Sequence, residues 1–134
     1  MQMPQPNAGI LARKPQIVAA LRALLPHDAV IDDPRETKAY ECDALAAYRC
    51  MPLAVVLPRN TQEVAAALKT CAQMGVPVVP RGAGTSLAGG SMPSEDAVVL
   101  GLARMNAVLE VDYTDRVIKV EAGRTNLSVT GAIE

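Results

Sequence analysis

A strand–helix–strand pattern across residues 53–79 constrains the fold more than any other feature of this sequence. Residues 53–57 form a continuous apolar run that closes at Pro58, which is typical of a strand covered on both faces. Residues 76–79 form a second short apolar run, and the segment between the two runs has helical spacing. The pattern has about the minimum length of a β-α-β unit, so it predicts two parallel strands joined by a right-handed crossover.

The helix of this unit is the best-marked element in the chain. Asn60 followed by Glu63 has the form of a capping box, which predicts the start of the helix. Gly75 is a typical residue just beyond a helix C-terminus. The apolar residues between these signals recur at helical spacing: Val64, Ala67, Leu68, Cys71 and Ala72.

Weaker patterns precede this unit. Residues 15–25 predict an amphipathic helix, and residues 29–31 predict a short strand. The Asp-Asp-Pro sequence at 32–34 marks the start of a helix over residues 35–40. Residues 42–51 fit no single element.

Further strand patterns follow the unit. Residues 97–102 predict a strand, and residues 108–112 and 117–122 alternate in polarity like the two strands of a hairpin. Thr125 marks the start of another helix. The sequence therefore predicts an α+β fold, in which a small parallel β-α-β subdomain with flanking helices precedes an antiparallel hairpin.

The composition indicates one soluble globular domain and excludes several partners. The 134 residues include 13 Lys plus Arg and 14 Asp plus Glu, a formal charge of −1, and 50% are hydrophobic. Because the basic residues are scattered and Phe and Trp are absent, we expect no binding to nucleic acid. No apolar run approaches the roughly 18 residues of a transmembrane helix.

Cysteine usage and the N-terminal segment bear on metal binding and location. Three cysteines without a CxxC pair, and a single histidine, His27, lead us to expect no metal site and reduced thiols. The first 16 residues lack the order of charged and apolar residues found in a signal peptide. We therefore expect a cytoplasmic protein.

The one anomaly of composition is a glycine-rich segment directly after the second strand. Six of the nine glycines lie within residues 75–101, and four of them lie within residues 82–90. The carboxyl end of a parallel sheet is where α/β proteins place ligands. Glycines there let successive N–H groups converge on an anion, and Arg81, Thr85 and Ser86 add further donors. The segment therefore predicts a site for a phosphate or a diphosphate.

Two other phosphate motifs fit this segment poorly. A P-loop ends in Gly-Lys-Ser/Thr, but no lysine occurs between Lys69 and Lys119. A dinucleotide fingerprint needs a third glycine where this chain has Leu87, and Pro93 opposes the helix that must follow. A glycine-rich turn that binds nothing stays open as an alternative.

Several short motifs in one order give the chain a family resemblance. They are Val-Pro-Val-Val-Pro at 76–80, Arg-Gly-Ala-Gly-Thr-Ser-Leu-Ala-Gly-Gly at 81–90, Ala-Arg-Met-Asn at 103–106, Val-Leu-Glu-Val-Asp at 108–112 and Val-Glu-Ala-Gly at 120–123. Together they resemble the FAD-linked oxidases of the p-cresol methylhydroxylase and vanillyl-alcohol oxidase type. Within that family, the chain is most similar to the flavin subunit of glycolate oxidase and to the D-lactate dehydrogenases.

The resemblance implies a FAD-binding domain in which FAD lies between a small parallel sheet and a larger antiparallel sheet. It divides the chain into an N-terminal helical segment, residues 1–52, and a partial FAD-binding domain, residues 53–134. Domains of this family are usually longer. We therefore expect this chain to be one piece of a larger enzyme, to bind FAD weakly or not at all and to be inactive by itself.

The resemblance also implies which residues bind the cofactor. Those that match the diphosphate loop are Pro80, Arg81, Gly82, Ala83, Gly84, Thr85 and Ser86. Gly89 would continue the wall on the flavin side, and Gly123 would let the backbone approach FAD. Relatives that tether FAD covalently often carry histidine at the position of Thr85, so we expect noncovalent FAD. Arg124 stands where many relatives have an aliphatic residue, which puts a cation near the cofactor cleft.

The implied function is the FAD-binding portion of a flavin-dependent 2-hydroxy-acid oxidase or dehydrogenase of the glycolate or D-lactate type. Such an oxidoreductase acts on CH–OH groups, and its FAD accepts a hydride from the α-carbon of the substrate. The sequence identifies no catalytic residue and leaves an iron–sulfur partner subunit open. Two alternatives remain: a noncatalytic fragment that self-associates or pairs with the rest of the enzyme, and a non-flavin phosphate or nucleotide binder.

Overall fold

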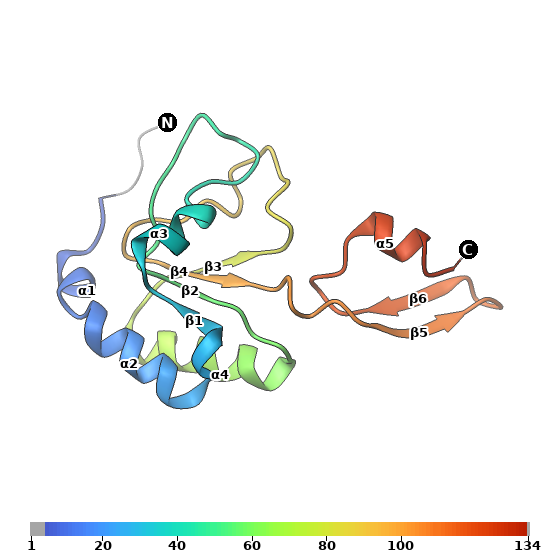
Figure 1. Cartoon of the computed structure of the whole chain (residues 1–134), viewed down its shortest axis with the longest axis horizontal. Helices are drawn as coiled ribbons and strands as arrows, with labels where there is room; N and C mark the ends of the chain where they lie inside the picture. The colour runs from blue at the N-terminus through green and yellow to red at the C-terminus, as the bar shows by residue number, and fades with distance from the viewer. Residues whose placement is uncertain (1–4, 134) are drawn as a thin grey trace.

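The computed structural model describes residues 5–133, which form a four-stranded sheet with helices and a two-stranded hairpin beside it (Figure 1). The helices, with η marking 3-10 helices, are α1 (Ala8–Ala12), α2 (Lys14–Leu24), η1 (His27–Ala29), α3 (Pro34–Thr37), η2 (Lys38–Tyr40), α4 (Thr61–Met74) and α5 (Asn126–Thr130). The strands are β1 (Val30–Ile31), β2 (Ala54–Val56), β3 (Val78–Arg81), β4 (Val98–Gly101), β5 (Val108–Asp112) and β6 (Val117–Val120). None of the helices in this range has the length and apolar character needed to cross a lipid bilayer.

The sheet order is β1-β2-β4-β3, so β4 lies between the two strands of the predicted β-α-β unit. Both of these strands run parallel to β4, and Val55 of β2 and Val79 of β3 each lie opposite Val99. The prediction of two parallel strands is therefore confirmed. The short strand β1 pairs antiparallel with β2, with Val30 opposite Val56. As a result, the carboxyl ends of β2, β4 and β3 share one edge of the sheet.

Aliphatic side chains between the sheet and the helices form the core. Every residue of β2 and β4 is buried, as expected for strands covered on both faces. Helices α2 and α4 pack against each other on one side of the sheet (Figure 1). Large side chains with almost no exposure include Ile17, Leu21, Leu53, Val56 and Val98. Burial of each such side chain contributes about 1.5–3 kcal/mol. The helices before residue 52 therefore share one core with the strands that follow it.

The predicted signals of α4 are present in the structure. Asn60 Oδ1 accepts a hydrogen bond from the Glu63 amide at 2.9 Å, and Gly75 has a left-handed φ of 67°. The Glu63 carboxylate reaches back to the Arg59 amide at 2.8 Å, whereas a capping box uses the amide of the cap residue itself. The predicted helix start is confirmed, with this one change of partner.

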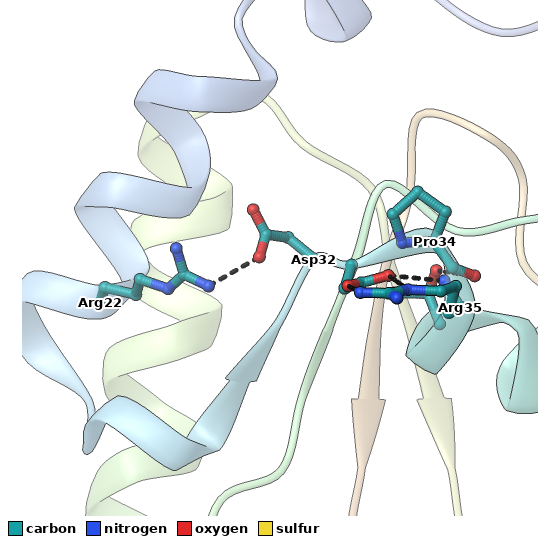
Figure 2. Close-up of polar contacts among 6 residues, drawn as sticks. Arg22, Asp32, Pro34 and Arg35 are labelled. Atoms are coloured by element: carbon teal, nitrogen blue, oxygen red, sulfur yellow. Dashed lines mark hydrogen bonds and ion pairs between the residues drawn. The ribbon is translucent and has the colours of Figure 1, made fainter.

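Two arginines hold the chain that leaves β1. Arg22 of α2 binds the Asp32 carboxylate at 2.6 Å, and Arg35 binds the Asp33 carboxylate at 2.7 Å (Figure 2). The Asp33 side chain also accepts a hydrogen bond from the Arg35 amide at 2.8 Å, which caps α3. The predicted helix start at 32–34 is confirmed, and α3 continues into η2.

The hairpin β5–β6 and helix α5 stand at the end of the sheet where β4 finishes (Figure 1). Asp112 Oδ1 accepts hydrogen bonds from the amides of Thr114 and Asp115 at 2.8 and 2.9 Å, which orders the turn. The predicted hairpin is confirmed, although β6 ends at Val120 rather than at residue 122. The helix predicted from Thr125 is confirmed as α5, with that residue as its N-cap.

Helix α1 is not predicted by the sequence patterns. Its five residues are fewer than two helical turns, which is too short to show an apolar period. Asn7 caps it by accepting a hydrogen bond from the Gly9 amide at 2.9 Å. The Asn7 amide donates to the Asp96 carboxylate at 2.9 Å, and this bond ties the helix to the turn before β4.

Candidate functional site

The glycine-rich segment lies at the carboxyl edge of the sheet, directly after β3. Strand pairing ends where the Arg81 carbonyl accepts a hydrogen bond from the Leu102 amide at 2.8 Å, and residues 82–90 form neither helix nor strand. Gly84 and Gly89 have left-handed φ angles of 71° and 73°. The predicted loop is therefore a loop and not the start of a helix, and Figure 1 shows it rising from the end of β3.

The amides at the start of this loop are available to a ligand. Among residues 5–133, no acceptor receives a hydrogen bond from the backbone N–H groups of residues 82–86. Most of these residues are exposed, and Gly84 is half-buried. A run of unpaired N–H groups beside small side chains can bind an anion such as a diphosphate.

Hydroxyl groups add donors to the loop. Thr85 is exposed, and its hydroxyl makes no hydrogen bond within the described residues. Ser86 Oγ accepts a hydrogen bond from the Ala88 amide at 3.2 Å, which leaves the hydroxyl hydrogen for another acceptor. Pro80 has no N–H and lies in the edge strand β3, where a missing donor interrupts no pairing. A role for Pro80 at the site would therefore be steric.

The Arg81 side chain packs against the loop and against residues 40–42. Its Nη1 donates to the Cys42 carbonyl at 2.7 Å, and its guanidinium carbon lies 5.6 Å from the centre of the Tyr40 ring. A Cβ added to Gly84 would collide with the same guanidinium group. The sequence predicts that Arg81 donates hydrogen bonds to a phosphate. In the structure, protein groups already occupy part of its donor capacity.

Gly123 lies where the hairpin meets the sheet. Its amide donates to the Met105 carbonyl at 2.8 Å, and a Cβ here would collide with the Leu102 carbonyl group. The contact that requires glycine is thus with protein backbone. The neighbouring Arg124 donates to the carbonyls of Asn106 at 3.0 Å and Ser128 at 2.8 Å, so its guanidinium group links α5 to the start of the hairpin.

Asp28 joins three segments at the same edge of the sheet. Its carboxylate accepts hydrogen bonds from Arg59 at 2.6 Å and from Arg104 at 3.0 Å. Desolvation raises the pKa of Asp28, but the Arg59 hydrogen bond and the charges of both arginines together lower it below its ordinary value. This ion-pair cluster therefore holds the loop after β4 against the segment before β1.

Sequence patterns do not predict the contact between residues 40–45 and the glycine loop. Cys42 and Arg81 are 39 positions apart, and no short motif encodes such a pair. The one available signal is that Tyr40 is among only three tyrosines in a chain without Phe or Trp. In the described part of the chain, no three His, Cys, Asp or Glu side chains gather in a metal-binding arrangement.

Replacing Gly84 with alanine tests whether the loop needs its left-handed turn. The substitution Gly84→Ala places a Cβ at a φ of 71° and against the Arg81 guanidinium group, and left-handed backbone costs a non-glycine residue about 1–2 kcal/mol. Urea unfolding should show a loss of this size. Gly90→Ala is the matched control, because its Cβ meets nothing within 4 Å and its φ is not positive. Equal stabilities of the two variants would contradict the requirement for a left-handed glycine at position 84.

The ion-pair cluster at Asp28 predicts a pH dependence of stability. Because the folded-state pKa of Asp28 lies below its unfolded value of about 4, its stabilisation is present above pH 4 and is lost as the pH falls through the folded pKa. Asp28→Asn should therefore be less stable than wild type at pH 7, with the difference shrinking in acid. Asp115→Asn, in the exposed hairpin turn, is the control. If the free energies of unfolding of wild type and Asp28→Asn change with pH in parallel, the ion-pair cluster is not the source of the pH dependence.

Comparison with known sequences assigns this chain to a family. The model of FAD_binding_4, described as FAD binding domain, matches residues 52–133. Glycolate oxidase subunit GlcD of Escherichia coli (strain K12) is 41% identical over 117 residues, which cover 87% of this chain and 23% of that protein. Mitochondrial D-2-hydroxyglutarate dehydrogenase of Arabidopsis thaliana is 33% identical over 106 residues, which cover 79% of this chain and 19% of that protein. The chain thus spans less than a quarter of the length of these relatives.

Solved structures show the same fold. The 4-ethylphenol oxidase from Gulosibacter chungangensis superposes with a TM-score of 0.81 at 23% identity, over 99% of this chain and 26% of that one. p-Cresol methylhydroxylase superposes with a TM-score of 0.74 at 20% identity, over 96% of this chain and 25% of that one. These matches confirm the predicted α+β fold of the p-cresol methylhydroxylase type. The family match over residues 52–133 shows that the chain belongs to the FAD binding domain family, FAD_binding_4, with FAD as its cofactor.

Proposed function

We propose that this chain is the FAD-binding portion of a flavin-dependent oxidoreductase that acts on the CH–OH group of a 2-hydroxy acid, of the glycolate or D-lactate type. The observation that carries the proposal is the run of amides at residues 82–86, which donate to no acceptor in the described range and belong to mostly exposed residues. Named relatives support the substrate class, because glycolate and D-2-hydroxyglutarate are both 2-hydroxy acids.

In this proposal the glycine loop holds FAD by its diphosphate. The amides of residues 82–86 donate to diphosphate oxygens, and the hydroxyls of Thr85 and Ser86 add neutral donors. Gly84 and Gly89 supply the left-handed turns of the loop. The attachment is noncovalent, since residue 85 is a threonine. When bound, FAD supplies the acceptor for a hydride from the α-carbon of the substrate.

The proposal also covers the larger protein. Because the chain spans 23% of its relative in Escherichia coli, we place the groups that bind and activate the substrate outside these residues. The name "subunit" of that relative supports a partner protein, and we propose an iron–sulfur subunit that receives the electrons. The family match begins at residue 52, which supports residue 53 as the start of the FAD-binding part, and the helical segment before it packs into the same core. A cytoplasmic location stays part of the proposal.

A nuclear magnetic resonance titration of the 134-residue chain tests the cofactor site. We expect the amide signals of residues 82–86 and Gly89 to shift on addition of FAD, with a weak Kd of about 0.1 mM, or roughly −5.5 kcal/mol. ADP should shift the same signals because it carries a diphosphate, and riboflavin should not because it carries no phosphate. No shift with FAD, or shifts confined to other residues, would contradict the proposal. Equal affinities for FAD and ADP would favour the non-flavin nucleotide binder.

The reaction class is tested by adding a 2-hydroxy acid anaerobically to the FAD-loaded protein that contains this domain. Glycolate or D-lactate should bleach the absorbance of oxidised flavin. Acetate is the matched control, since it has the same carboxylate as glycolate and no hydroxyl group. Bleaching by acetate, or none by any 2-hydroxy acid, would exclude the proposed substrate class.

Self-association is a second candidate function, favoured by the hairpin. Both of its strands have an unpaired outer edge, and it lies among exposed apolar side chains. These are Leu109, Tyr113, Val117, Leu127 and Ile133. Unpaired strand edges and apolar patches are surfaces through which chains associate.

Light scattering over a range of protein concentrations tests this association. The measured mass should rise with concentration, and Leu109→Lys on β5 should suppress the rise because it charges the edge strand. Leu24→Lys, on the exposed face of α2, is the control and should leave the association unchanged. A constant monomer mass for the wild-type chain would exclude this candidate.

A further inference from the structure

Residues 40–45, which we call the strap, run beside the glycine loop. The strap begins at the end of η2 and continues without helix or strand. It lies outside residues 52–133, the part of the chain matched by the family model. Membership of the family therefore assigns the strap no role, and its contacts must be judged from the structure.

Two hydrogen bonds join the strap to the loop. Arg81, at the start of the loop, donates through Nη1 to the Cys42 carbonyl at 2.7 Å. The Ser86 carbonyl, in the middle of the loop, accepts a hydrogen bond from the Ala44 amide at 3.1 Å. Both bonds use loop groups other than the N–H groups of residues 82–86, which stay unpaired. The strap therefore fixes the course of the loop without using the N–H groups of residues 82–86.

The strap is itself held in place. Asp43 is 5% exposed, and its Oδ1 accepts a hydrogen bond from the Leu45 amide at 2.9 Å. The Glu41 carbonyl accepts a hydrogen bond from the Cys50 amide at 2.8 Å. Leu45 Cδ2 lies 3.6 Å from the place where a Cβ on Gly89 would stand, so the strap also lies near the far end of the loop.

The Arg81 guanidinium group sits at the centre of this arrangement. It lies over the Tyr40 ring, with 5.6 Å between its central carbon and the ring centroid, which is within the range of a cation–π interaction. It also fills the space where Gly84 has no side chain. Arg81 therefore contacts the strap on one side and the backbone of the loop on the other.

We propose that the strap and Arg81 form a brace that holds the glycine loop in its diphosphate-binding conformation before FAD binds. Arg81 is then a positioning residue, acting through Gly84, and not a ligand of the diphosphate, while Ala44 of the strap holds Ser86. This inference rests on the proposed function for its ligand, but the brace itself is a property of the free chain. Preorganisation of this kind raises affinity because binding no longer has to order the loop.

The first test measures the loop in the absence of FAD. Backbone order parameters of residues 82–86 should be near the rigid value of about 0.85 in the wild-type chain and should fall toward about 0.6 in Tyr40→Leu. Tyr40→Phe keeps the ring under the guanidinium group and should match wild type. Tyr113→Leu, in the exposed hairpin turn, is the matched control for loss of a tyrosine.

The second test measures affinity for FAD in the same variants. Tyr40→Leu should weaken binding about fivefold to tenfold through loss of the cation–π contact, although Tyr40 lies in η2, outside the glycine loop. Arg81→Gln should weaken binding at least as much, and the double variant should bind like Arg81→Gln alone, because both changes disable one brace. If Tyr40→Leu does not fold, Arg81→Gln gives the same order-parameter measurement.

The outcomes separate the brace from the proposed function. Unchanged order parameters in both Tyr40→Leu and Arg81→Gln would overturn the brace, whether or not the chain binds FAD. Weaker FAD binding by Arg81→Gln, with a loop as rigid as in wild type, would also overturn it and make Arg81 a direct ligand. Absence of FAD binding by a wild-type chain with a rigid loop would contradict the proposed function and leave the brace supported.

Discussion

Pairing of β4 with strands on both of its sides is the interaction on which the rest of the structure depends. β4 holds β2 through the Val55–Val99 register and β3 through the Val79–Val99 register, so three carboxyl ends meet at one edge. The glycine loop and the ion pairs of Asp28 all lie along that edge. Without β4, β2 and β3 would have no partner in common, and the loop would have no fixed origin.

The polar groups at this edge of the sheet have two roles: charged side chains stabilise the protein, and uncharged donors are available to a ligand. Charged side chains there contact one another or the protein backbone, as Asp28 does with its two arginines and Arg81 with Cys42. The unpaired donors are backbone amides and hydroxyls of residues 82–86. Amides need no desolvation of a full charge and stay fixed by the course of the chain. A site of this kind relies on the shape of the loop more than on the charge of any one side chain.

Local sequence signals predict most of the helices and strands. The features that the sequence does not predict depend on pairing between residues far apart in the chain. The capping residues of α4, the Asp-Asp-Pro start of α3 and the alternation of β5 and β6 each act within a few residues, so they were predictable. The position of β4 between β2 and β3 depends on pairing between residues 44 positions apart for β2 and 20 positions apart for β3. The same holds for the approach of Tyr40 and Cys42 to Arg81, and for the backbone contact that requires glycine at position 123.

The proline in the edge strand β3 affects whether a further strand can pair with the sheet. Along β3, Val79 and Arg81 face β4, so Val78 and Pro80 present their backbone to the open side. Pro80 carries no hydrogen there, so an incoming strand would find a gap in its ladder at the position next to the loop. The margin of the sheet nearest the glycines is therefore less suited to the addition of another strand than an edge strand without proline.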